Sequence, residues 1–200
     1  MKKIALVCFL LGFASTAQAA VITFTSESAY LSAIGAYSSF VEGFESVDWE
    51  PSRPAGTSSI TSQGLTWTGS DLIRTGDGWA RSGRYGVFDS IGDPDIIYVL
   101  NSADRLFAAG GWFRNTTASE LTFSLGSTPV WTVPLSADHF FFGVLDTEGF
   151  TALTLSTSSG HWGADDFTFA RGGVVPEPGS MILLGTGLVG LGRAWKKRRG

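Results

Sequence analysis

The stretch Leu121-Thr-Phe-Ser-Leu125 alternates apolar and polar side chains, and Val130-Trp-Thr-Val133 repeats this alternation shortly afterwards. A period of two places the apolar side chains of an extended strand on one face. Turn-forming residues such as Gly, Ser and Pro separate the two runs, as they do between neighbouring strands of an antiparallel sheet. This stretch therefore predicts a sheet with one buried face.

Similar runs occur along most of the chain, and Gly, Asp, Ser and Pro punctuate them. One segment differs, because residues 26–34 place Tyr30, Ala33 and Ile34 at helical spacing behind Thr25 as the N-cap. Short strands at close spacing predict a mainly β, antiparallel, jelly-roll-like sandwich with one short helix near the N-terminus. The further runs are Gly64-Leu-Thr-Trp-Thr68, Arg84-Tyr-Gly-Val-Phe88, Ile96-Ile-Tyr-Val-Leu100, residues 150–155 and Asp166-Phe-Thr-Phe-Ala170.

Residues 20–172 form the predicted exported domain, and their charge is strongly acidic. Every basic residue in this range is an arginine, and seven arginines against seventeen carboxylates give a formal charge of about −10. Such a surface disfavours nucleic acid and anionic lipid as partners. It is compatible with divalent cations and with neutral glycans.

The first 19 residues have the organisation of a signal peptide. Met1-Lys-Lys3 is positively charged, residues 4–13 are apolar, and Ala17-Gln-Ala19 has the small-x-small form of a signal peptidase site. We expect an apolar signal helix that signal peptidase removes after Ala19. The only cysteine, Cys8, leaves with it, so the mature chain has no disulfide.

Residues 173–200 combine a proline pair, an apolar segment and a cationic end. Pro176-Glu177-Pro178 stays extended, since each proline fixes φ and lacks an N–H. The apolar segment predicts a transmembrane helix from about residue 179 to residue 195, and its residues 179–194 span roughly 24 Å at about 1.5 Å per residue. The alternative is a buried helix of a soluble domain, which the cations directly behind it disfavour. These cations are Arg193, Lys196, Lys197, Arg198 and Arg199.

This tail resembles the PEP-CTERM sorting signal of exported proteins in Gram-negative bacteria that make exopolysaccharide. The resemblance covers residues 175–199 and implies recognition by exosortase, a membrane enzyme that cuts near the motif. It implies an exported protein, first anchored in the inner membrane with its domain outside, and then passed to the cell surface or extracellular matrix. Because cations stay on the cytoplasmic side of a membrane, we expect the chain's C-terminus to stay inside.

Catalysis has little support in the sequence. The exported domain has two histidines, His139 and His161, and contains no Gly-x-Ser-x-Gly or His-Glu-x-x-His motif. We therefore predict a non-catalytic protein and assign no catalytic residue, although a Ser-His-Asp set stays open.

Two carboxylates, Asp165 and Asp166, open the last strand run. The stretch Ala164-Asp-Asp-Phe-Thr-Phe169 loosely resembles the closing strand of jelly-roll lectin and carbohydrate-binding domains, which implies Ca²⁺ as a ligand. Hard oxygen ligands suit this ion. The alternative is structural, with the carboxylates bonded to backbone amides or to arginine.

A Gly-rich stretch supplies the second candidate site, a sugar-binding loop. An aromatic ring stacks on a sugar, while charged groups bind its hydroxyls. Internal Arg–Asp pairing that only pins the loop is the alternative. By contrast, Trp67, Trp112 and Trp131 lie within strand runs and are predicted to be core residues. The proposed ligand residues are Arg74, Asp77, Trp79, Arg81 and Arg84.

Two hypotheses follow for the domain. It is either a non-catalytic surface or matrix protein, with exopolysaccharide as its proposed ligand, or a polysaccharide hydrolase on the same scaffold. The hydrolase would need two facing carboxylates, one with a raised pKa.

Overall fold

The computed structural model describes residues 21–89, 96–100, 104–115, 117–118, 120–134 and 138–172. These residues are mainly β, with one α-helix and short 3-10 helices. The elements in chain order are β1 (Val21–Phe24), α1 (Glu27–Ala33), β2 (Ser38–Glu42), η2 (Val47–Ser52), β3 (Thr57–Ser62), β4 (Leu65–Gly76), η3 (Asp77–Trp79), β5 (Gly86–Asp89), β6 (Ile96–Leu100), β7 (Leu106–Asn115), β8 (Glu120–Leu125), β9 (Thr128–Pro134), β10 (Phe140–Phe150), β11 (Ala152–Ser156) and β12 (Trp162–Arg171).

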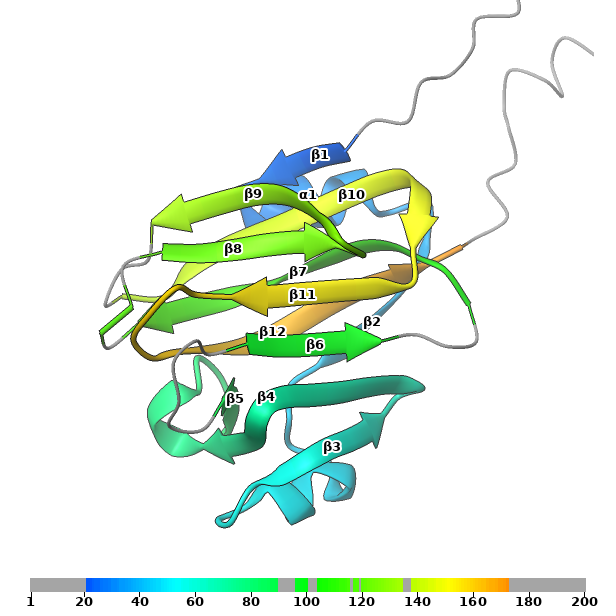
Figure 1. The fold of residues 1–200 in the computed structure, drawn as a ribbon. Coiled ribbons are helices and arrows are strands. Elements are labelled where there is room, and N and C mark those ends of the chain that lie inside the picture. The colour runs from blue at the N-terminus through cyan, green and yellow to red at the C-terminus, as the bar shows by residue number, and fades with distance from the viewer. Residues whose placement is uncertain are drawn as a thin grey trace, which may run out of the picture.

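The strands fold into two layers. Their order is β1-β10-β7-β12-β5-β4-β6-β11-β8-β9, while β2 pairs with β12 and β3 with β4. Each pairing is antiparallel. In Figure 1, β9, β8, β11 and β6 form the front layer, and β10, β7 and β12 lie behind it. The predicted antiparallel β-sandwich is confirmed.

The long strand β4 joins the two layers. Its residues 66–69 pair with β6 of the front layer, and its residues 73–76 pair with β5, which borders β12. Bridging two sheets with one strand makes the hydrogen-bonded order continuous from β1 to β9.

Aromatic rings fill the space between the layers. Trp67 makes edge contacts with Phe44, Trp49 and Phe167 at centroid distances of 5.3, 5.5 and 5.4 Å. All four rings are fully buried, and such edge-to-face pairs add to the stabilisation that burial gives.

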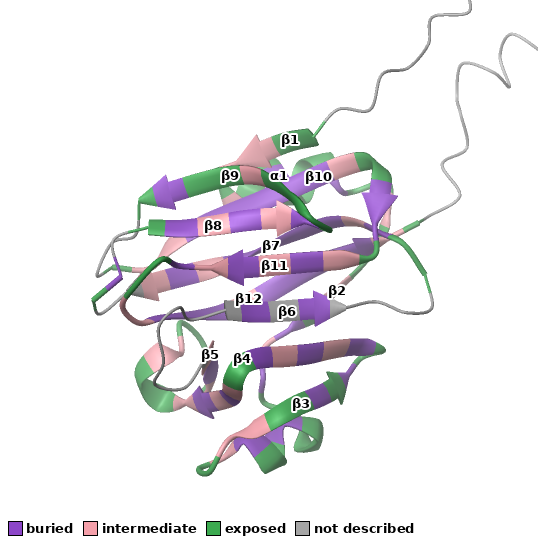
Figure 2. Cartoon of the chain, in the orientation of Figure 1, coloured by how far each residue is buried: buried purple, intermediate pink, exposed green. Residues whose placement is uncertain are grey.

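The alternation of β8 and β11 is visible in Figure 2, where buried and intermediate residues take turns along each strand. In β8 the side chains of Leu121, Phe123 and Leu125 point to the core. The alternation in the sequence therefore identified the buried face of this strand.

Helix α1 covers the outer face of the back layer. Tyr30 and Ile34 pack there on Phe141 and Leu145 of β10, and the Tyr30 hydroxyl donates a hydrogen bond to the Thr168 carbonyl at 2.7 Å. The N-cap is Ser26, whose Oγ accepts the Ala29 N–H. The expectation that Thr25 is the cap was therefore wrong by one residue.

The predicted signal helix and C-terminal transmembrane helix lie outside the described residues. Among the residues that the structure does describe, none of the helices has the length and apolar character needed to span a bilayer.

Candidate functional site

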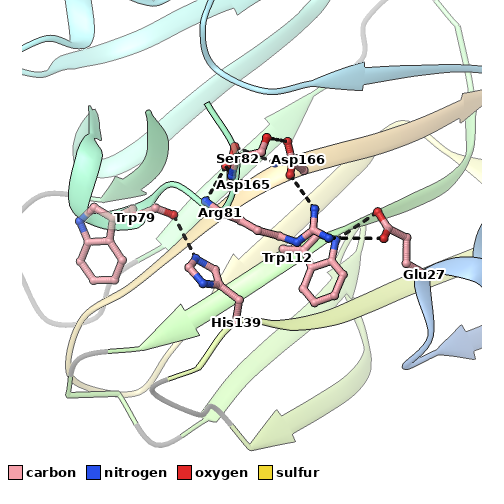
Figure 3. A network of polar contacts seen from close by, with 8 residues as sticks. All are labelled: Glu27, Trp79, Arg81, Ser82, Trp112, His139, Asp165 and Asp166. Carbon is pink, nitrogen blue, oxygen red and sulfur yellow. Dashed lines mark hydrogen bonds and ion pairs between the residues drawn. The ribbon is translucent and has the colours of Figure 1, made fainter. Parts of the chain in front are cut away.

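The two neighbouring carboxylates of β12, those of Asp165 and Asp166, contact the Gly-rich loop that follows η3 (Figure 3). Asp165 is fully buried. Its Oδ2 accepts the backbone N–H groups of Arg81 at 2.7 Å and Ser82 at 3.0 Å, and its Oδ1 accepts the N–H of Asp166 at 2.8 Å. The carboxylate thus satisfies three backbone donors.

A bulge in β12 allows both carboxylates to face this loop. Consecutive residues of a regular strand point to opposite faces, but the pairing register with β7 shifts between Asp165 and Thr168. Asp166 also has a φ of 50°, in the left-handed region. Bulges re-aim side chains in this way, and here Asp166 Oδ1 accepts the Ser82 hydroxyl at 2.7 Å.

Arg81 joins the loop to three other elements. Its guanidinium lies 3.8 Å from the Trp112 ring centre on β7 and 2.9 Å from Asp166 Oδ2 on β12. It also lies 3.7 Å from Glu27 Oε2 on α1. Trp112 Nε1 donates to the other oxygen of Glu27 at 3.1 Å, which closes the network.

Burial raises the pKa of Asp165 from 3.8 to about 6. The backbone hydrogen bonds from Ser82 and Arg81 oppose this shift, because they favour the ionised carboxylate, and the charge of Asp166 adds to it. The raised pKa therefore reflects mainly the loss of solvent around Asp165.

Trp79 is half-buried beneath the same loop. Its ring stacks on Phe88 of β5 at 5.5 Å between centroids. Gly163 of β12 leaves room for it, since a Cβ there would lie 2.3 Å from a ring carbon. The Arg114 guanidinium lies 6.0 Å from the ring centre, and His139 Nε2 lies 3.5 Å from the Trp79 carbonyl oxygen. Trp79 thus anchors the loop to the sheet.

The other predicted ligand residues have separate surroundings. Arg74 is part of β4 rather than of the loop, and Asp77 is exposed in η3. The backbone N–H of Arg84 donates to Glu45 Oε1 at 2.6 Å, and its guanidinium lies 5.2 Å from the Tyr85 ring centre. The ion pair between Arg81 and Asp166 is the internal Arg–Asp pairing that the sequence offered as the alternative to sugar binding. Ligand binding by this loop stays a prediction.

The calcium prediction also stays untested. Over the described ranges, no group of three or more His, Cys, Asp or Glu side chains is placed to hold a metal ion. Ca²⁺ takes six to eight oxygen ligands, whereas oxygens of both Asp165 and Asp166 already accept protein donors. We take no metal chemistry from this pair.

Sequence reasoning missed two hollows, whose lining residues include the C-terminal end of β12 for one and the end of β10 for the other. In Figure 1 these two strand ends lie on the right. Arg105 lines both hollows. The larger, of about 360 Å³, is lined by Ser38, Asp104, Arg105, Phe107, Arg171 and Gly172. The smaller, of about 240 Å³, is lined by Arg105, Leu125, Gly126, Asp146, Gly149, Phe150 and Thr151.

Trp131 of β9 corrects another expectation. Predicted as a core residue, it is 48% exposed, and its ring stacks on buried Phe142 at 6.4 Å. β9 ends the strand order, so the opposite layer covers this ring only partly. Trp67 is fully buried as expected, and Trp112 is half-buried.

The tail matches a known sorting signal. Residues 174–199 match the family described as the PEP-CTERM protein-sorting motif. The chain thus combines an antiparallel β-sandwich with a PEP-CTERM sorting motif, as the resemblance of its tail had indicated. The search of curated proteins returned no match.

Several solved carbohydrate-binding modules align weakly with the chain. A family 29 module from Piromyces equi is 8% identical with a TM-score of 0.40, and the match covers 80% of this chain and 95% of the module. A family 6 module from Clostridium stercorarium with cellobiose is 17% identical with a TM-score of 0.35, covering 68% and 95%. A family 61 module with β-1,4-galactotriose is 14% identical with a TM-score of 0.35, covering 65% and 94%. These TM-scores are low, and we take neither a ligand nor a site from these structures.

Proposed function

We propose that this chain is the precursor of an exported surface or matrix protein, which exosortase processes at its tail and whose β-sandwich binds exopolysaccharide without catalysis. The observation that carries the proposal is the sorting motif at residues 174–199, directly behind a sandwich whose last strand ends at Arg171. A complete domain followed at once by a sorting tail is the arrangement expected of displayed cargo.

The two ends of the domain fit this route. β1 begins at Val21, so cleavage after Ala19 by signal peptidase removes no residue of the sheet. At the other end, the helix expected near residues 179–195 holds the precursor in the inner membrane, with its cationic end inside. Cutting near Pro176-Glu177-Pro178 then releases the domain to the cell surface or matrix.

Neither of the two hollows supplies the pair of carboxylates that glycoside hydrolysis uses. A glycosidase needs two carboxyl groups that face one substrate, whereas each of the two hollows is lined by a single one, Asp104 or Asp146. Asp165 has the raised pKa of a general acid, but it is fully buried and engaged by backbone N–H groups.

Binding to a glycan is supported by exposed features of the domain. Trp131 offers a half-exposed ring at an edge strand, and aromatic rings of this kind stack on sugar rings. The larger hollow adds an aromatic ring, Phe107, among hydrogen-bonding side chains.

Sorting and binding are tested separately. In an exosortase-bearing host, we expect Glu177→Ala to leave full-length chain in the inner membrane, while the control Glu50→Ala is shortened and reaches the surface. Delivery of Glu177→Ala like the wild type would show that Glu177 is not read by exosortase. For binding, the purified chain should sediment with exopolysaccharide from the same host, and a chain that stays in the supernatant contradicts the binding role.

A further inference from the structure

The larger hollow places two arginines at the point where the domain ends. Arg105 precedes β7, and Arg171 is the last residue of β12. Arg105 Nη1 donates to the carbonyl oxygens of Glu148 and Gly149 at 3.0 and 2.9 Å. The Arg171 guanidinium lies 4.5 Å from the Phe40 ring centre and donates to the Gln63 carbonyl. Both guanidinium groups are therefore held in place.

Neither arginine has an acidic partner within the described residues. The ion pairs that the structure shows there both belong to Arg81, although the domain carries an excess of carboxylates. Without a carboxylate partner, both guanidinium groups can pair with an anion.

We propose that this hollow binds a uronic acid residue of an acidic polysaccharide. The planar guanidinium group matches a carboxylate and pairs with it through charge-assisted hydrogen bonds. Phe107 provides an apolar surface for the sugar ring, and the hydroxyl of Ser38 is placed to bind a sugar hydroxyl. The inference rests on the proposed function and deepens it, because it names the sugar class that the domain recognises.

The acidic charge of the whole domain does not prevent this contact. Charges on the surface are screened over about 8 Å at physiological ionic strength, so the distant carboxylates repel a polyanion only weakly. Within the lining of the hollow, the two arginines outnumber the single carboxylate, Asp104. Selectivity for acidic sugar thus comes from a local cationic site on an acidic protein.

The test measures binding of tetragalacturonate by calorimetry, with the carboxyl-reduced tetrasaccharide as the matched neutral ligand. The full-length chain is used in detergent. Arg105→Gln and Arg171→Gln each remove one charge from the hollow, and Arg53→Gln removes the same charge from a half-buried position outside both hollows and outside the predicted sugar-binding loop. Ser38→Tyr fills the hollow and keeps both arginines, and circular dichroism checks that each variant is folded.

We expect the wild type to prefer tetragalacturonate over the reduced ligand by at least about tenfold, as loss of charge-assisted hydrogen bonds implies. Affinity should fall by about tenfold or more in Arg105→Gln, Arg171→Gln and Ser38→Tyr, and stay unchanged in Arg53→Gln. Equal affinity for both ligands, or folded hollow variants that bind like the wild type, would overturn the inference. If the wild type sediments with exopolysaccharide but ignores tetragalacturonate, the uronate site is wrong and the proposed function stands. If it binds neither, both fail.

Discussion

The carboxylate of Asp165 accepts the backbone N–H of Arg81 at 2.7 Å, across 84 positions of the sequence. The same oxygen accepts the next N–H, that of Ser82. One buried side chain in the middle of the back layer therefore holds the loop that carries Arg81, so the ionisation of Asp165 is linked to the stability of the fold.

This link predicts a pH dependence. Folding raises the pKa of Asp165 from 3.8 to about 6, so the native state binds the proton more tightly than the unfolded chain. The resulting stabilisation is complete below about pH 4 and is lost as the pH rises through about 6. We expect this contribution to the free energy of unfolding to fall by up to about 3 kcal/mol between about pH 4 and pH 7. Denaturant unfolding of residues 20–172 measures it, and Asp165→Asn should lack this slope. An identical pH profile in both proteins contradicts the prediction.

Removal of Arg81 should weaken the attachment of the loop. Arg81→Ala loses the stacking on Trp112 and the ion pair with Asp166, and we expect a loss of about 1–2 kcal/mol in the free energy of unfolding. Arg84→Ala is the matched control and should change stability by less than about 0.5 kcal/mol. Hydrogen exchange at the amides of residues 81 and 82 should become faster in Arg81→Ala alone. Equal exchange in the two variants would argue against the clamp.

The two tryptophans Trp67 and Trp131 should respond differently to truncation. Trp67 is fully buried, so Trp67→Ala should cost about 3–5 kcal/mol in stability. Trp131 keeps about half of its surface in water, and Trp131→Ala should cost only about 1–2 kcal/mol. Urea unfolding of the two variants checks this order, and comparable losses would mean that Trp131 is a core residue after all.

The charge of the tail predicts the orientation of the precursor. With five basic residues behind the apolar segment, the C-terminus should stay in the cytoplasm. A reporter fused after Gly200 that is active only in the cytoplasm should therefore give signal in the unprocessed Glu177→Ala chain. Activity of a periplasm-only reporter at the same position would reverse the assignment.

Much of the fold was predictable because strand alternation is a local property of the sequence. The alternation in β8 identified the buried residues of that strand. For the short helix, the predicted N-cap, Thr25, was one residue before the observed N-cap, Ser26. Alternation gives the face of a side chain but does not say what covers that face. Trp131 was therefore misassigned, since its exposure depends on β9 lying at the end of the strand order.

The candidate sites were less predictable because they depend on contacts between distant segments. The sequence singled out Arg81, Asp165 and Asp166 as charged residues, but not their meeting, which requires the bulge and the positive φ of Asp166. Arg105 and Arg171 gave no local signal, because only the pairing of β7 with β12 brings them to one hollow.

The position of β12 also has a consequence for the timing of export. β12 is the last strand in the chain, yet it lies inside the back layer and pairs with β2, β5 and β7. In a chain secreted from its N-terminus, these three strands cross the membrane before their shared partner does. The back layer keeps a gap until residues 162–171 emerge, and the next segment to enter the channel is the sorting tail. On the proposed export route, completion of the domain and delivery of the tail to the membrane are thus consecutive steps of one translocation.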